Sequence, residues 1–275
     1  MQQFRPTNFQ VLPPIIKNLL IINVLVYLAQ SVLGTSVGNY INNMFALHVI
    51  QSHYFKPWQL FTYMFMHGSW MHIFSNMFAL WMFGSILENF WGPKRFLTFY
   101  IICGIGAAAC QLIYTEFSLF GIEHAYANLN THLTFDNFLQ FNNKYHFDKY
   151  DGRVLELIHY WKMQPNSLDL ARAASMVIQQ NYDVLVNTET VGASGAIFGV
   201  LVAFGYLFPN TYLYFYFLVP IKAKWFVTGY IAYELYLGFQ NSVGDNVAHM
   251  AHIGGGLIGF ILVYFWNKKN RNNFY

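Results

Sequence analysis

The chain has 275 residues, of which 56% are hydrophobic and only 10% are charged, whereas about 25% of the residues are charged in an ordinary soluble domain. A soluble core of this size could not bury so much apolar surface, so the composition indicates a protein that is surrounded by membrane lipid. The net charge is only +3, which gives no reason to expect a nucleic-acid partner.

A membrane-spanning helix needs about 20 largely apolar residues. Arg5 and Lys17, before and at the start of the first candidate segment, resemble the charged start of a signal peptide. The apolar run is longer than that of a signal, however, and no clear cleavage motif follows it. We therefore expect it to remain as the first membrane helix. The predicted fold is an all-α membrane protein, a single-domain bundle of six helices over about residues 15–34, 70–89, 95–114, 194–208, 223–239 and 248–266.

The basic residues predict the orientation of this bundle. With a cytoplasmic N-terminus, most lysines and arginines near the helix ends fall on the cytoplasmic side, as the positive-inside rule requires. Both termini are then cytoplasmic, and a bacterial plasma membrane is the expected location, since no organelle-targeting segment is obvious. The apolar stretch at residues 58–66 is too short to span the membrane and is expected at the interface.

A long polar insertion, residues 116–190, separates the third and fourth predicted helices and is expected to be extracytoplasmic. Its pattern predicts an amphipathic helix over residues 153–163 and a second helix to Gln180, with Asn166 or Ser167 as the N-cap. It contains too few apolar residues to predict a strong independent domain. The insertion leads into the segment that contains Ser194. It could cover the entrance to a site there, or it could be a tolerated surface addition.

Two cysteines, Cys103 and Cys110, are seven residues apart in the third predicted helix. A disulfide between positions two turns apart on one helix is excluded by geometry. Both cysteines are therefore expected to be packing residues.

Polar residues within membrane helices are costly and mark candidate functional sites. The segment that begins at Ser194 meets Pro209 after only fifteen residues, too few to cross the bilayer core. Its glycine-rich start, residues 192–195, should therefore lie below the membrane surface, where irregular backbone lines protein or a water-filled cavity. Serine is a common packing residue in membrane helices, but in such a cavity it is also a candidate nucleophile.

A nucleophilic serine needs a general base. The fourth and sixth predicted helices run in the same direction, and each contains a small-xxx-small pair, Gly195–Gly199 and Gly255–Gly259, that would allow close contact. If these glycines face each other, Ser194 and His252 differ in depth by only about 3 Å. That difference is compatible with a hydrogen bond between the two side chains.

Acyl transfer also requires donors for an oxyanion. His72 and Asn76 are four residues apart on the second predicted helix and therefore share a face. With the Ser194 backbone N–H at a helix start, they could form an oxyanion hole, or they could simply hydrogen-bond across helices to hold the bundle together.

An acid to orient the histidine is not expected. We expect no Asp or Glu in the outer half of a predicted helix to play this part, and Asp245, in the loop before the sixth helix, is a disfavoured candidate. A Ser–His dyad is therefore predicted. Phe198, one turn below Ser194, could hold the imidazole by stacking or could be an ordinary packing residue.

These motifs resemble those of the rhomboid family. Gly192-x-Ser194-Gly195 is similar to its nucleophile motif, and Ala251-His252-x-Gly254-Gly255 is similar to its catalytic-histidine motif. The first loop and second helix of the family are matched by the following residues: Pro57, Trp58, Gln59, Leu60, His67, His72, Asn76, Glu88 and Gly92.

The resemblance implies an intramembrane serine endopeptidase that cleaves single-pass transmembrane proteins in or near their membrane segment, without a metal or cofactor. It also distinguishes between two histidines. His249 and His252 are three residues apart and nearly on one face, so spacing alone does not choose the base. The glycines that follow His252 match the family motif, which favours His252.

Three other functions are alternatives to this one. Rhomboid-like pseudoproteases bind and escort membrane clients, but they typically lack the nucleophile or the base. A membrane metalloprotease is disfavoured because the chain has no His-Glu-x-x-His motif and no carboxylate was found near the histidines. A transporter is disfavoured because the two halves of the chain show no visible symmetry.

Overall fold

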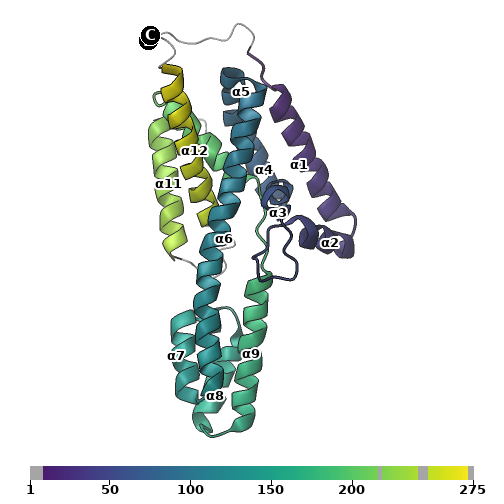
Figure 1. Ribbon diagram of the computed structural model, residues 1–275, viewed down its shortest axis with the longest axis vertical. Coiled ribbons are helices and arrows are strands. Elements are labelled where there is room, and N and C mark those ends of the chain that lie inside the picture. The colour runs from purple at the N-terminus through teal and green to yellow at the C-terminus, as the bar shows by residue number, and fades with distance from the viewer. Residues whose placement is uncertain (1–8, 216–218, 241–246, 272–275) are drawn as a thin grey trace.

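The computed structural model describes residues 9–215, 219–240 and 247–271, and helices dominate these ranges (Figure 1). Helices overlap all six segments expected to cross the membrane. They are α1 (Pro14–Val32), α4 (Trp70–Ala79) continued by η2 (Leu80–Gly84) and α5 (Ser85–Trp91), α6 (Pro93–Thr131), α10 (Ser194–Leu207), α11 (Ala223–Gln240) and α12 (His249–Arg271).

Four helices in the described part of the chain are long and apolar enough to cross a membrane: Pro14–Val32, Trp70–Trp91, Pro93–Thr131 and His249–Lys268. The start of α1 and the end of α12 lie at the same end of the bundle, opposite the insertion (Figure 1). The described part of the chain is therefore mostly helical, with four helices suited to cross a membrane. The count of six spanning helices and the cytoplasmic position of the termini stay predictions.

Helix α10 is the most enclosed element of the bundle. It has only 14 residues, which gives about 21 Å at 1.5 Å per residue, less than the roughly 30 Å of a bilayer core. All residues from Gly195 to Gly205 are buried. Such an enclosed helix can begin below the membrane surface because protein rather than lipid surrounds its first turn.

Two pairs of glycines bring α10 and α12 into direct backbone contact, as the small-xxx-small pattern predicted. A Cβ atom on Gly259 would lie 2.6 Å from the Cα atom of Gly199, and one on Gly255 would overlap the carbonyl oxygen of Gly195. Any larger side chain would separate the two helices. The glycine contacts therefore determine how far Ser194 on α10 and His252 on α12 lie from each other along the helix axes.

A buried carboxylate of α5 bonds the start of α1. Glu88 accepts hydrogen bonds from the backbone N–H groups of Ile15 and Ile16, both at 2.9 Å. These N–H groups have no partner within their own helix, and an anion at a helix N-terminus is favoured by the helix dipole.

The insertion is a helical bundle with its own hydrophobic core. Helix α6 continues to Thr131, well beyond the predicted end at residue 114, and is followed by α7 (Phe135–Tyr145), η3 (Phe147–Lys149), α8 (Gly152–Met163) and α9 (Leu168–Asn187). Trp161 is only 1% exposed and belongs to this core. The extended α6 supplies one wall of that core. Whether the insertion is an independent domain stays a prediction.

The two helices expected within the insertion are present. Helix α8 matches the range 153–163 to within one residue, and Ser167 is the N-cap of α9, accepting a bond from the Leu170 N–H. Helix α9 continues beyond Gln180 to Asn187.

Several short elements were not predicted. They are α2 (Thr35–Phe45), α3 (Gln59–Thr62) and η1 (Tyr63–Phe65), and an antiparallel pair, β1 (Tyr212–Phe215) and β2 (Val219–Lys222). The buried Gln59 organises the loop before α3, because its side-chain amide donates to the carbonyl groups of Asn43 and Tyr54 and its oxygen accepts from the His48 N–H.

Candidate active site

The backbone before α10 turns sharply at Gly192, which has φ +127°, a conformation that residues with a side chain rarely adopt. The Gly192 N–H donates to the carbonyl oxygen of Tyr63 at 3.0 Å. A Cβ atom at position 192 would lie 2.8 Å from Nε2 of His72. Glycine is thus required here both by the turn and by the closeness of His72, and the turn places Ser194 as the first residue of α10.

Ser194 and His252 are in direct contact. The Ser194 Oγ atom lies 2.8 Å from Nε2 of His252, although the two residues are 58 positions apart in the chain. Ser194 is half-buried and His252 is 8% exposed. The ring of Phe198 stacks on the His252 imidazole, with centroids 4.3 Å apart and planes at 11°. This packing restricts the rotation of the imidazole, which is what a base aimed at one hydroxyl requires.

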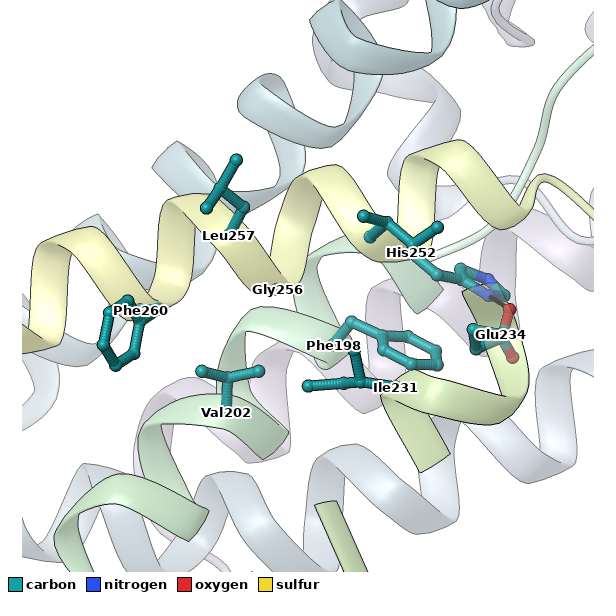
Figure 2. A pocket seen from close by; sticks show the side chains of 9 residues that line it. Phe198, Val202, Ile231, Glu234, His252, Gly256, Leu257 and Phe260 are labelled. Atoms are coloured by element: carbon teal, nitrogen blue, oxygen red, sulfur yellow. Dashed lines mark hydrogen bonds and ion pairs between the residues drawn. The ribbon is translucent and has the colours of Figure 1, made fainter. Parts of the chain in front are cut away.

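The opposite ring nitrogen of His252 contacts a carboxylate that the sequence reasoning missed. His252 Nδ1 lies 2.8 Å from Oε2 of Glu234 on α11, and Figure 2 shows the two side chains together. The expectation that no acid lies in the outer half of a spanning helix was wrong. The signal was available, since an ionisable residue inside the apolar segment 223–239 is a candidate functional residue by its cost alone. Asp245 lies outside the described residues.

Glu234 also contacts the second histidine. Nδ1 of His249 lies 2.6 Å from the same Oε2 atom of Glu234. All three side chains are buried, with exposed fractions of 5% for Glu234, 7% for His249 and 8% for His252. His249 thus contacts the carboxylate, whereas it is His252 that reaches Ser194.

Glu234, His249 and His252 are also the residues that could hold a metal ion, since their donor atoms lie within 4.8 Å of one another. Zinc ligands lie about 2.0 Å from the metal, so tetrahedral neighbours are about 3.3 Å apart. The nitrogen–oxygen distances of 2.6 and 2.8 Å are shorter and are those of direct hydrogen bonds. The geometry is that of a carboxylate shared by two imidazoles.

The candidate oxyanion donors lie on the other side of Ser194. The Nε2 atom of His72 is beside Gly192, and its Nδ1 faces the Gly68 N–H at 3.5 Å. Asn76 is buried, and no partner for its Nδ2 is found among the described residues. The ring of His67 packs edge-on against His72 at 5.1 Å between centroids. A half-buried imidazole thus lies close to the turn that carries Ser194, and the amide donor of Asn76 follows one turn later on α4. Their catalytic role stays a prediction.

An apolar cavity of about 250 Å³ borders His252 and Glu234. Helices α10, α11 and α12 line it, and Phe198 lies beside His252 and Glu234 on its lining (Figure 2). Its other lining residues are Val202, Ile231, Ile253, Gly256, Leu257 and Phe260.

The insertion is joined to the segment that leads to Ser194. Thr190 forms a β-bridge with Leu47, and the side chain of Asn187 accepts a hydrogen bond from Ser52 Oγ at 2.7 Å. The insertion itself extends away from the bundle along α6 (Figure 1). Whether it covers the site stays a prediction.

Comparison with known proteins places these features in a family. The model of the rhomboid domain matches residues 54–141 and 169–269, which is more than half of the chain. An uncharacterized mitochondrial rhomboid protein of Schizosaccharomyces pombe is 26% identical over 221 residues, covering 78% of this chain and 52% of the relative. The chain therefore spans about half the length of that relative.

These matches and the apolar helices identify an integral membrane protein. They do not support the expected bacterial plasma membrane, because the relative is a mitochondrial protein of a fungus.

Proposed function

The chain belongs to the rhomboid family, and on that premise we propose that it is an intramembrane serine endopeptidase acting on single-pass transmembrane proteins. The observation that carries the proposal is the 2.8 Å contact between Ser194 Oγ and His252 Nε2 at a buried helix start. A serine hydroxyl is a weak nucleophile unless a base accepts its proton. The family match supports the same activity, because the sequence motifs around both residues lie within the matched ranges.

In the first half of the reaction, Ser194 Oγ attacks the carbonyl carbon of the scissile peptide bond, and His252 Nε2 takes the hydroxyl proton. The tetrahedral intermediate then collapses, the peptide C–N bond breaks, and His252 returns the proton to the leaving amine. The product is an ester between Ser194 and the N-terminal part of the substrate.

The intermediate carries a negative charge on the former carbonyl oxygen. His72, Asn76 and the Ser194 backbone N–H are the donors that we assign to this oxyanion. Donors fixed in advance at the site of developing charge contribute about 2.7–4 kcal/mol each to the lowering of the barrier. Gly192 supports this arrangement because the lack of a side chain leaves His72 close to Ser194.

In the second half, water attacks the acyl ester, and His252 again acts as base and then as acid. The reaction needs water at a depth where lipid surrounds the bundle, and the irregular backbone before α10 is consistent with a water-accessible cavity there.

The substrate class follows from the chemistry of a helix in lipid. A peptide bond within a membrane helix has its carbonyl hydrogen-bonded and shielded. Substrates should therefore carry residues such as Gly or Pro that allow local unwinding near the cleaved bond.

The test is cleavage of a single-pass reporter protein by the purified chain in lipid vesicles. The reporter carries a Gly–Pro pair in its membrane segment, and a matched reporter has leucines at those positions. We expect cleavage of the first reporter at a much higher rate than the second, and none by Ser194→Ala. Binding of both reporters without cleavage would instead identify a client-escorting pseudoprotease.

A further inference from the structure

We propose that Glu234 is a positioning residue that converts the Ser194–His252 pair into a Ser–His–Glu triad. The inference rests on the proposed function and deepens it. Its basis is the chain of contacts from Oε2 of Glu234 to Nδ1 of His252 at 2.8 Å and from Nε2 of His252 to Oγ of Ser194, also at 2.8 Å.

The hydrogen positions follow from donor and acceptor chemistry. An ionised carboxylate only accepts hydrogen bonds, and one oxygen of Glu234 faces Nδ1 of both His249 and His252. Both bonds form together when each Nδ1 carries its hydrogen. A neutral His252 then has a lone pair on Nε2, aimed at the Ser194 hydroxyl. Glu234 thereby selects the tautomer that can act as a base.

The same carboxylate stabilises the charge that forms during the reaction. When His252 takes the serine proton it becomes an imidazolium, next to an anion that is already in place. Glu234 is only 5% exposed, and in such a low-dielectric site the attraction between the two charges is stronger than in water. An acid in this position need not become protonated itself.

His249 gives the carboxylate a second anchor. Its Nδ1 bond to Oε2 of Glu234 is 2.6 Å long, so Glu234 is held from α12 at two points one turn apart. A carboxylate within an apolar helix is costly unless it is paired, and the two histidines provide that pairing. The arrangement holds α11 against α12 at the level of the nucleophile.

The experiment compares kcat, KM and the melting temperature of the 275-residue chain in lipid vesicles for the wild type and two variants of Glu234. Glu234→Gln is nearly isosteric, but its amide can donate to Nδ1 of His252 and so favours the wrong tautomer. In soluble serine proteases the equivalent change lowers kcat by about 10⁴. We expect kcat to fall by about 10² or more, with KM within about twofold. Glu234→Asp keeps the carboxylate and should recover at least part of the lost kcat.

Glu88→Gln is the matched control, because Glu88 is equally buried but bonds backbone N–H groups of α1. We expect it to lower the melting temperature while the kcat of the folded fraction stays within about twofold of the wild type.

Three outcomes would overturn the inference. The first is a folded Glu234→Gln protein with the kcat of the wild type. The second is a loss of kcat that follows the folded fraction alone, as in a purely structural role. The third is activity that a chelator removes and Zn²⁺ restores, since the three side chains would then hold a metal. If the wild type is itself no more active than Ser194→Ala, the proposed protease function fails as well. Failure of the triad alone is thereby distinguished from failure of the proposed function.

Discussion

Gly255 lies directly against the carbonyl group of Gly195, so that the backbones of α12 and α10 touch at the residue that follows the candidate nucleophile. The contact sets the depth of one helix against the other. Because Ser194 precedes Gly195 and His252 lies three residues before Gly255, their side chains meet at 2.8 Å. The chemistry of the site thus depends on two residues that have no side chain.

The first prediction concerns Gly255→Ala. The added Cβ atom would overlap the Gly195 carbonyl, so the helices must move apart, at a cost of about 1–3 kcal/mol for overpacking. We expect a lower melting temperature and at least a tenfold loss of reporter cleavage by the folded protein.

Gly229→Ala on α11 is the control for Gly255→Ala. A Cβ atom there would meet nothing within 4 Å, and alanine favours a helix over glycine by up to about 1 kcal/mol. Its melting temperature should be unchanged or higher. If both variants behave like the wild type, the backbone contact does not determine the geometry of the site.

The second prediction concerns the oxyanion donors. His72→Ala and Asn76→Ala should each lower kcat by about 10²–10³ with little change in KM, because the missing bond forms mainly in the transition state. Asn23→Ala removes a buried asparagine of α1 that bonds only the Leu19 carbonyl among the described residues, and its kcat should stay near that of the wild type. Equal, small effects for all three variants would leave His72 and Asn76 as packing residues.

The third prediction distinguishes the two histidines of α12. His252→Ala should abolish cleavage, since it removes the group that contacts Ser194. His249→Ala should reduce cleavage without abolishing it, because it removes only one of the two bonds to Glu234. Turnover of the reporter in vesicles measures both. An inactive but folded His249→Ala protein, beside an active His252→Ala protein, would reverse the assignment of the base.

The fourth prediction concerns the insertion. Asp151 is the N-cap of α8, and its carboxylate also bonds the side chains of Arg153 and Asn181. These bonds, led by the one from Arg153, lower the pKa of Asp151 from 3.8 to about 2. A carboxylate with a lowered pKa contributes stability above its unfolded-state value, and this contribution is lost as the pH falls from about 4 through 2.

Loss of the Asp151 cap should cost about 1 kcal/mol. We therefore expect faster hydrogen exchange in α8 and α9 for Asp151→Ala than for the wild type at pH 7, with a difference that shrinks as the pH falls from about 4 toward 2. Asp151→Asn keeps a cap acceptor and should lie between the two. Equal exchange at pH 7 would contradict the role of this cap.

The contact between Ser194 and His252 was predictable because it depends on helix geometry alone. Two glycine pairs at the same spacing define which faces meet, and the rise per residue then gives the relative depth. Phe198 was expected one turn from Ser194 on the same helix, and its stacking on His252 was one of two outcomes left open. Such short-range relations follow from the sequence of one or two helices.

A carboxylate inside the apolar segment 223–239 was itself a signal that was overlooked, but the pairing of Glu234 with His252 was not predictable because it depends on how a third helix is rotated. The segment 223–239 has no strong amphipathic pattern to show which face meets α12. The extent of the insertion was missed for a related reason. Helix α6 continues 17 residues past the predicted end at residue 114, to Thr131, and Leu129 near its end is buried in the core that α6 shares with α7, α8 and α9.

The most direct test of the central claim is labelling of the detergent-purified protein with a fluorophosphonate probe, which reacts with activated serines. The wild type should be labelled, whereas Ser194→Ala and His252→Ala should not be, although all three are folded. Labelling of Ser194→Ala at the wild-type rate would contradict the assignment of the nucleophile. A folded wild-type protein that is neither labelled nor able to cleave the reporter would contradict the proposed protease activity.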